Sequence, residues 1–391
     1  MKALVLAAGR GTRVRPLTER MPKAMIPIIN QPVMALIVDH LRRFGVSRIM
    51  VNTSYLSSAI ESYFGDGQRF DVEMAYSFEG REEDGRLIDE PVGSAGAIRR
   101  IHDHSGFFDE TFVVVCGDAI IDLDLGELLD FHRQKRALAT IAVHQVSREE
   151  VSRYGVVIRD GDGRISEFQE KPRPEEARSC TISTGIYVFE PEVLEHIPSG
   201  VRFDIGGDLF PELARSGRLY GMQSAQPWQW LDIGQVSDLH EVTMKALRGE
   251  IRGFRIPGRE LRPGVHVGIN VRVNLDRCHI VPPVHIGGSA QVEDGASLVG
   301  PLAIGAGALI EAGAHLEQSV VLDYTRVRGG TSCRGKILGS QFCVDADGTI
   351  LDQRHTDTAW LFADSRGDAR LSEDQLGVLA TIRSLAGQAT A

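Results

Sequence analysis

The sequence lacks any apolar run of about 18 residues, the length that a membrane-spanning helix needs. Its first residues also lack the apolar core of a signal peptide, because glycine and charged residues follow a very short apolar segment. The five cysteines are odd in number and widely spaced, which favours reduced thiols over a disulfide framework or a zinc site. These absences predict a cytoplasmic protein without a membrane span.

A broad basic surface and two common phosphate-binding motifs are missing as well. The formal net charge of -10 argues against nucleic acid or an anionic membrane as a partner, although it leaves room for a local basic pocket. No Gly-Lys-Ser/Thr sequence occurs, and Val14 stands where the dinucleotide fingerprint has its third glycine. The chain also offers no Ser/His/Asp triad. A Walker loop, a dinucleotide fold and triad hydrolysis are therefore not predicted.

The sequence does have a glycine-rich basic stretch at its start. Residues 3–8 form a short apolar run that is typical of a buried strand, and Gly9 and Gly11 end it. Glycine lets the backbone turn sharply and approach a bulky anion. Five cations follow, with one acid among them: Arg10, Arg13, Arg15, Arg20 and Lys23. By spacing alone, this stretch is either a phosphate loop or a strand, a turn and a solvated basic segment.

Strand-like and helix-like segments alternate through the first 250 residues. Strands are expected at 48–52, 111–116 and 140–146, a hairpin at 153–172, and helices at 37–44, 59–64, 97–102, 125–133, 203–217 and 236–247. Asp124 is expected to cap the helix at 125–133. The alternation predicts an α/β domain with a mostly parallel sheet and helices on both faces. Ligands of such sheets bind beyond the carboxyl ends of the strands, where the Gly9 loop would lie.

A hexad repeat marks the second half of the chain. One large aliphatic residue recurs every six positions at Ile286, Val292, Leu298, Ile304, Ile310, Leu316 and Leu322. A second, mostly small residue recurs two positions earlier, at Val284, Ala290, Ala296, Leu302, Ala308, Ala314 and Val320. This pattern is typical of a left-handed parallel β-helix, whose inner corners need these residues.

The expected organisation is therefore a catalytic domain at 1–250, a β-helix at 251–350 and a helical tail at 351–391. Such helices can carry acyltransferase sites, but His266, His279, His285 and His315 are scattered and are predicted to be surface residues. A structural, oligomerising or regulatory β-helix is the favoured interpretation. The apolar spacing at 371–385 predicts a tail that packs on a partner, so a homo-oligomer is expected through the β-helix or the tail.

Five segments resemble motifs of the sugar-1-phosphate nucleotidyltransferases, also called NDP-sugar pyrophosphorylases, in the family's order. The opening LAAGRGTRVRPLTERMPKAMIPI is similar nearly residue by residue, with Ala8 and Val14 as mild departures. EPVGSAG at 90–96, Gly117-Asp118, EKP at 170–172 and WLDIG at 230–234 follow, and Thr184-Gly185 resembles a strand that borders the sugar. The resemblance implies a Rossmann-like sheet. Within the family, the chain looks most like β-helix-bearing members that form UDP-glucose or GDP-mannose.

The resemblance also implies roles for single residues. Gly9, Gly11 and Thr12 would wrap the triphosphate, Arg13 would steady it and Lys23 would reach the reacting phosphate. Asp118 and Asp232 would hold Mg²⁺, Gly93 and Gly96 would contact the base, Glu170 would bind sugar hydroxyls, and Lys171 would pair with the sugar phosphate. Further substrate contacts are implied at Gly117, Tyr154, Gly155, Thr184 and Gly185.

The implied reaction joins an NTP and a sugar 1-phosphate into an NDP-sugar and pyrophosphate. UTP with glucose 1-phosphate is the preferred substrate pair, and GTP with mannose 1-phosphate is the alternative. An alternative of another class is a regulatory paralogue that keeps the fold and binds the NDP-sugar without catalysis. Intact Arg13, Lys23, Asp118, Lys171 and Asp232 argue against that paralogue.

Overall fold

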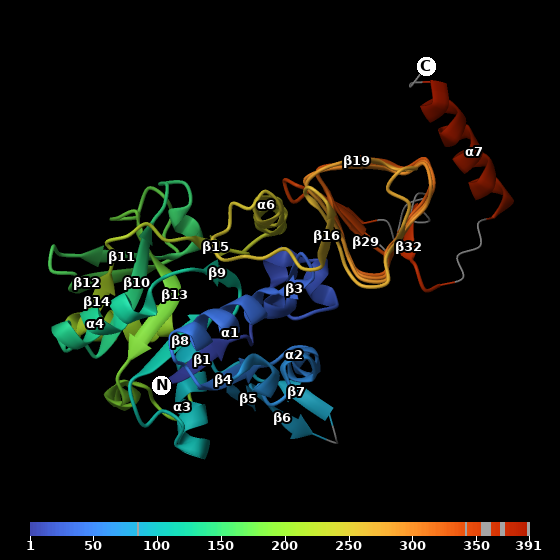
Figure 1. Ribbon diagram of the computed structural model, residues 1–391. Coiled ribbons are helices and arrows are strands. Elements are labelled where there is room, and N and C mark those ends of the chain that lie inside the picture. The colour runs from blue at the N-terminus through green and yellow to red at the C-terminus, as the bar shows by residue number, and fades with distance from the viewer. Residues whose placement is uncertain (84–85, 341, 353–360, 368–371, 389–391) are drawn as a thin grey trace. The chain divides into compact units, whose positions relative to one another are not determined.

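A computed structural model describes residues 1–83, 86–340, 342–352, 361–367 and 372–388 of the chain (Figure 1). The chain forms two compact units. The first unit comprises residues 1–12, 17–26 and 33–232, and the second comprises residues 13–16, 27–32 and 233–391.

The first unit is built on a nine-stranded mixed sheet with the order β12-β11-β13-β8-β1-β4-β5, in which β10 pairs with both β13 and β14. Strands β8, β1, β4 and β5 are parallel, and Figure 1 shows them side by side. This arrangement confirms the predicted Rossmann-like sheet. The strands are β1 (Lys2–Leu6), β4 (Arg48–Thr53), β5 (Glu73–Phe78), β8 (Phe112–Cys116), β10 (Ala139–Gln145), β11 (Gly155–Arg159), β12 (Ile165–Glu170), β13 (Thr181–Phe189) and β14 (Leu219–Met222).

Amphipathic helices pack their apolar residues on this sheet. The helices are α1 (Val33–Arg43), α2 (Ser57–Phe64), α3 (Ser94–Ser105), α4 (Leu125–Lys135) and α5 (Phe210–Ser216). Phe108, Phe112, Phe189 and Phe210 lie in one fully buried cluster. The Asp124 carboxylate accepts hydrogen bonds from Gly126 N at 2.8 Å and Glu127 N at 3.2 Å, so the predicted cap of α4 is confirmed.

Helix α3 begins three residues earlier than the sequence predicted because a distant segment caps it. The Phe203 carbonyl accepts hydrogen bonds from Ala95 N at 3.0 Å and Gly96 N at 2.8 Å, and the Asp204 carboxylate accepts one from the Ser94 hydroxyl at 3.0 Å. The segment that supplies this cap continues as a π-helical turn at Ile205–Leu209 before α5 begins. The single helix expected at 203–217 is therefore wrong, because its first turn widens.

Two short antiparallel pairs complete the first unit. β9 (Ala119–Ile121) pairs with β15 (Trp230–Asp232). β6 (Gly80–Glu83) pairs with β7 (Arg86–Asp89), so the charged segment that follows β5 is a hairpin.

The second unit is a parallel β-helix together with α6 (Val236–Leu247) and a hairpin of β2 (Pro27–Ile28) and β3 (Gln31–Pro32). Its stacked coils are drawn in orange in Figure 1. Partners in adjacent coils lie 18 residues apart in the registers Val284↔Leu302, Gln291↔Leu309 and Ser297↔His315, which is three hexads per coil. The strands are β16 (Arg259–Arg262), β17 (Val265–Val267), β18 (Arg272–Val273), β19 (His279–Val281), β20 (Val284–Ile286), β21 (Gln291–Val292), β22 (Ser297–Val299), β23 (Leu302–Ile304), β24 (Leu309–Ile310), β25 (His315–Glu317), β26 (Val320–Val321), β27 (Thr325–Val327), β28 (Ser332–Arg334), β29 (Lys336–Gly339), β30 (Phe342–Asp345), β31 (Ile350–Asp352) and β32 (Phe362–Asp364).

The hexad pattern identifies the inward residues correctly up to Leu316. It is then wrong at Leu322, which is only half-buried, whereas Val321 lies in the core. The register explains the difference: Ile304 pairs with Val321, 17 residues on, so this coil is one residue shorter and the inward side of the strand changes. The prediction of a surface histidine is also wrong for His285, which is 1% exposed.

Helix α7 (Glu373–Gln388) falls in the segment expected to form a helical tail. Within the described ranges, no helix combines the length and the apolar character that crossing a membrane requires. All five cysteines are free.

Candidate active site

The loop after β1 makes one edge of the candidate site. Gly11 has φ +60, and a side chain there would lie 2.8 Å from the Thr18 methyl and 3.1 Å from the Lys23 Cβ, so only glycine fits. The Thr18 hydroxyl donates to the Gly11 carbonyl at 2.8 Å and closes the turn. Thr12 and Arg13 follow on a 3₁₀ turn with exposed side chains, whereas Gly9 has open space around its Cα.

Strands β9 and β15 bring the two candidate metal carboxylates together. Asp232 pairs in register with Ala119, the residue after Asp118. Gly117 starts this turn, and its N–H donates to the Leu6 carbonyl at 2.9 Å, which fixes Asp118 beyond the carboxyl ends of β1 and β8. Asp118 and Asp232 are 114 positions apart in the sequence, and the pairing of β9 with β15 makes them neighbours.

A cation lies beside each of these carboxylates. Lys23 forms an ion pair with Asp118, and Arg153 Nη2 lies 3.6 Å from the Asp232 carboxylate. Burial raises the pKa of the Cys116 thiol, at the end of β8, and the charges of Asp118, Lys23, Asp232 and Lys171 all act on it. The four predicted charged groups of the first unit therefore surround one point at the carboxyl end of β8, and Cys116 itself is not an activated nucleophile.

The hairpin of β11 and β12 presents the predicted sugar-phosphate residues at its end. Glu170 pairs in register with Gly155, and the Lys171 ammonium lies 2.9 Å from the Glu170 carboxylate. Lys171 has φ +45, a conformation that costs a non-glycine residue free energy and that gathers at functional sites. A side chain at Gly155 would overlap the Phe168 ring at 2.2 Å, so this glycine is needed for packing.

Thr184, Gly185 and Tyr154 form the wall next to this hairpin. The Thr184 hydroxyl is buried and donates to the Ala142 carbonyl at 2.7 Å, and the Thr184 carbonyl accepts from Trp230 Nε1 at 3.0 Å. The Tyr154 ring packs edge-on against Trp230 with ring centroids 5.0 Å apart. Thr184 thus serves the interior of the fold, whereas the two aromatic rings are only partly buried.

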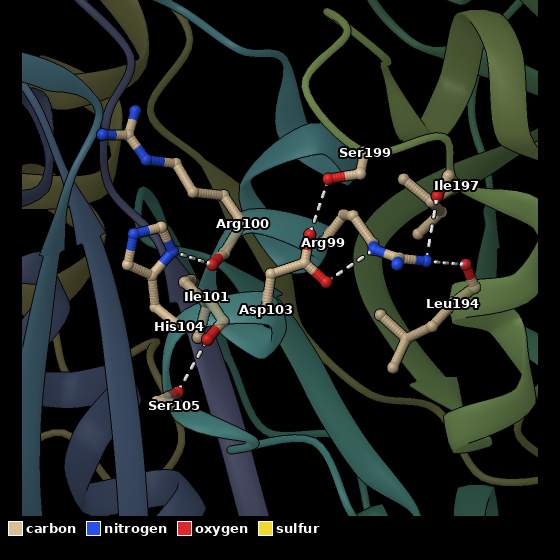
Figure 2. Close-up of polar contacts among 9 residues, drawn as sticks. All are labelled: Arg99, Arg100, Ile101, Asp103, His104, Ser105, Leu194, Ile197 and Ser199. Atoms are coloured by element: carbon tan, nitrogen blue, oxygen red, sulfur yellow. Dashed lines mark hydrogen bonds and ion pairs between the residues drawn. The ribbon is translucent and has the colours of Figure 1, made fainter.

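Gly93 and Gly96 lie at the start of α3, where the sequence predicts the base contact. A side chain at Gly93 would lie 2.5 Å from the Phe203 carbonyl, and one at Gly96 would lie 3.2 Å from the Val201 carbonyl. Both glycines therefore allow the 201–203 backbone to pack on α3. At its other end, α3 is held by Arg99, which Figure 2 shows reaching the carbonyls of Leu194 and Ile197.

The donor set suits a hard divalent cation. Mg²⁺ is bound in proteins by one or two carboxylates together with water and substrate phosphates, and Asp118 and Asp232 supply two such carboxylates at one strand edge. Among the described residues, no group of three or more His, Cys, Asp or Glu side chains forms a complete cage. The two carboxylates therefore fit a metal that is shared with a phosphorylated substrate.

Sequence reasoning missed Arg153 and Trp230. Arg153 directly precedes the Tyr154-Gly155 pair, and its guanidinium lies over the Tyr154 ring at 5.3 Å from the centroid. No local pattern places Arg153 beside Asp232, because their contact depends on tertiary packing. An arginine next to two predicted substrate residues was the available signal.

The fold and this strand-edge cluster of charges define a phosphate-transfer type of site, and residues 2–249 match the model of the nucleotidyl transferase family. The chain belongs to that family. It is 49% identical to the UTP–glucose-1-phosphate uridylyltransferase of Synechocystis sp. over 366 residues, which cover 94% of each protein.

More distant relatives share less of the chain. The mannose-1-phosphate guanylyltransferase of Mycobacterium tuberculosis is 30% identical over 330 residues, which cover 84% of this chain and 81% of that protein. A solved structure of UDP-glucose pyrophosphorylase complexed with UDP-glucose has a TM-score of 0.54 at 23% identity, and the match covers 63% of this chain and 98% of that one. This likeness supports the fold assignment of the nucleotidyl transferase domain.

Proposed function

We propose that this enzyme transfers a uridylyl group from UTP to glucose 1-phosphate and releases pyrophosphate. The observation that supports this substrate pair most is the 49% identity to a UTP–glucose-1-phosphate uridylyltransferase along 94% of both chains. The grouping of Lys23, Asp118, Lys171 and Asp232 around the end of β8 supports the reaction class.

The chemistry is a displacement at phosphorus. A phosphate oxygen of the sugar 1-phosphate attacks the α-phosphorus of UTP, and the bond to the pyrophosphate leaving group breaks. Because the attacking oxygen is already an anion at neutral pH, the reaction needs no general base. Alignment and relief of charge repulsion supply the rate acceleration, and orientation alone is worth roughly 7–11 kcal/mol.

The chain's own residues divide this work. Gly9, Gly11 and Thr12 approach the triphosphate with their backbone, and Arg13 and Lys23 neutralise it. Lys171 pairs with the sugar phosphate, Glu170 accepts hydrogen bonds from sugar hydroxyls, and Tyr154, Gly155 and Gly185 shape the sugar site. Arg153 keeps Asp232 oriented. Asp118 and Asp232 would hold Mg²⁺, which when bound neutralises charge on the phosphates.

The test is pyrophosphate release in a matrix of ATP, GTP, CTP, UTP and dTTP against the 1-phosphates of glucose, mannose and N-acetylglucosamine. We expect UTP with glucose 1-phosphate to give the highest kcat/KM. Preference for GTP with mannose 1-phosphate would overturn the substrate pair. Binding of UDP-glucose without turnover of any pair would identify a regulatory paralogue and overturn the reaction.

We also propose self-association through the C-terminal region. Leu376 and Val378 on α7 are 51% and 50% exposed, which leaves apolar surface for a second copy. Light scattering of the full chain and of a chain that ends at residue 372 should show a larger mass for the full chain. Equal masses per chain would contradict a role for α7.

A further inference from the structure

A buried polar pair, Asn52 and Glu79, lies at the carboxyl ends of β4 and β5. Asn52 is 2% exposed and Glu79 is 6% exposed. A buried carboxylate costs several kcal/mol unless hydrogen bonds compensate it, so its contacts indicate what it does. The reaction proposed above assigns no role to either residue.

The first contact fixes which way the Asn52 amide faces. Ala7, the residue that follows β1, donates its N–H to Asn52 Oδ1 at 2.9 Å. Because an amide oxygen only accepts and an amide nitrogen only donates, Nδ2 must point the other way. Asn52 Nδ2 donates to Glu79 Oε1. The residue at position 79 must therefore offer an acceptor to Asn52.

Glu79 connects this amide to the segment that leads into α3. The Glu79 carbonyl accepts from Glu90 N at 3.0 Å, which closes the base of the β6–β7 hairpin. Burial raises the pKa of Glu79, whereas a backbone hydrogen bond from Val92, the Asn52 amide and the charge of Arg100 oppose that rise. Both Asn52 and Val92 thus donate to the Glu79 side chain.

Arg100 ties the same hairpin to α3. Its guanidinium donates to the Gly80 carbonyl at 2.7 Å. Figure 2 shows Arg100 extending from the side of α3 opposite to Arg99, which reaches Leu194 and Ile197. The helix that starts with Ser94, Ala95 and Gly96 is thereby held from two sides, and Glu79 lies between its entry segment and Ala7.

We propose that Asn52 and Glu79 are positioning residues that set the spacing between the loop at 7–23 and the segment at 92–97. They would thereby set the distance at which the enzyme holds the triphosphate and the base of its NTP. This inference rests on the proposed function, which assigns the triphosphate to the first segment and the base to the second.

The decisive experiment exchanges the acid and the amide. In Glu79→Gln, one side-chain oxygen can no longer satisfy both Asn52 and Val92, and in Asn52→Asp two carboxylates face each other. The double variant Asn52→Asp/Glu79→Gln restores every hydrogen bond: Ala7 N to Asp, the Gln amide to Asp, and Val92 N to the Gln oxygen. Its net charge equals that of the unmodified protein.

The readout is the Kd of UTP by calorimetry, together with KM for each substrate. Losing one such hydrogen bond should weaken UTP binding about tenfold in each single variant. The double variant should return to within about threefold of the unmodified enzyme, and KM for the sugar phosphate should change less than KM for UTP. Should Glu79→Gln fail to fold, Glu79→Asp keeps two acceptor oxygens on a shorter side chain and should raise the Kd similarly.

Glu190→Gln is the matched control. Glu190 accepts from the Thr111 hydroxyl at 2.9 Å and contacts His132 Nε2 at 3.0 Å, but Thr111 precedes β8 and lies at the opposite edge of the sheet. This variant should lower Tm without changing the Kd of UTP. If Glu79→Gln behaves in the same way, or if the folded double variant is not rescued, the positioning role is overturned. An unmodified enzyme that binds UTP but turns over no substrate pair would instead overturn the proposed reaction.

Discussion

At the scale of the residue, the candidate site is a balance of opposite charges. Lys23 lies against Asp118, Arg153 against Asp232 and Lys171 against Glu170. Each cation can therefore turn to a phosphate when a substrate enters, and each carboxylate is then free for a new partner. A site of this kind needs both signs of charge because its substrates are anions and its metal is a cation.

The carboxylates should be essential for turnover and dispensable for folding. Asp118→Asn and Asp232→Asn should each lower Mg²⁺-dependent pyrophosphate release at least about a hundredfold, because charge that develops on the phosphates loses its counter-charge. Tm should stay within a few degrees. Asp124→Asn is the control, because asparagine caps a helix as well as aspartate does. Near-normal turnover in either site variant would refute its assignment to the metal.

Lys171 should discriminate between the two substrates. Lys171→Met should raise KM for the sugar phosphate by about tenfold or more, because one charge-assisted contact is lost, and should change the Kd of UTP little. Lys135→Met removes a lysine that pairs with Asp162 away from the site and should leave both values unchanged. An equal loss of affinity for both substrates would contradict the assignment.

At the scale of the element, glycine positions decide how closely the strand ends approach. Gly185 has φ +78, and a side chain there would lie 2.7 Å from the Cys116 sulfur. Strands β8 and β13 can therefore lie with Cys116 next to the Gly185 backbone, immediately beside Asp118. The geometry of the charged cluster depends on this close approach.

Gly185→Ala should destabilise the first unit by about 2 kcal/mol or more, because it combines a steric overlap with an unfavourable backbone conformation. Cys116→Ala in the same chain should recover part of this loss by removing the overlap but not the strain. Gly161→Ala, where no atom lies within 4 Å, is the control. Denaturant unfolding measures all three. A Gly185→Ala chain as stable as the control would contradict the packing argument.

The shortened coil of the β-helix makes a second prediction at this scale. Val321→Ala should cost about 2 kcal/mol, because it leaves a cavity in the core, whereas Leu322→Ala should cost less although it removes more atoms. The hexad pattern alone predicts the reverse order. Thermal unfolding of the two variants distinguishes the registers.

Local patterns predicted the elements that local physics determines. The strands β1, β4 and β8 and the helix α6 follow from apolar periodicity, and the Asp124 cap follows from its position. The start of α3 and the π-helical turn at 205–209 could not be predicted, because Phe203 and Asp204 cap α3 from more than 100 residues away. Likewise, motifs indicated Asp118 and Asp232, but only the pairing of β9 with β15 shows that they are neighbours.

At the scale of the whole molecule, the buried ionisable groups of the second unit govern its response to acid. Burial lowers the pKa of His285 to about 4, and the neighbouring His266 lowers it further. The unfolded chain binds this proton below about pH 6.5, whereas the folded chain stays neutral there. The stability that His285 allows is therefore fully present above pH 6.5 and is lost as the pH falls towards 4.

Between pH 6.5 and 4, this one group should lower the free energy of unfolding by about 3 kcal/mol. His285→Gln should have a correspondingly flatter dependence of stability on pH. His279→Gln, at an exposed position of β19, should follow the unmodified protein. Identical slopes for all three proteins would mean that His285 is already protonated in the fold.

The 18-residue coil makes the length of the second unit discontinuous. A strand of one coil lies on the strand 18 residues later, as Val284 lies on Leu302. An insertion or deletion of 18 residues therefore leaves every following side chain on the same wall and adds or removes one layer of about 4.8 Å. Other lengths turn core residues outward or transfer them to another wall, as the single missing residue before Val321 already does locally. Evolution and engineering can thus change the height of this stack like that of a staircase, in whole steps.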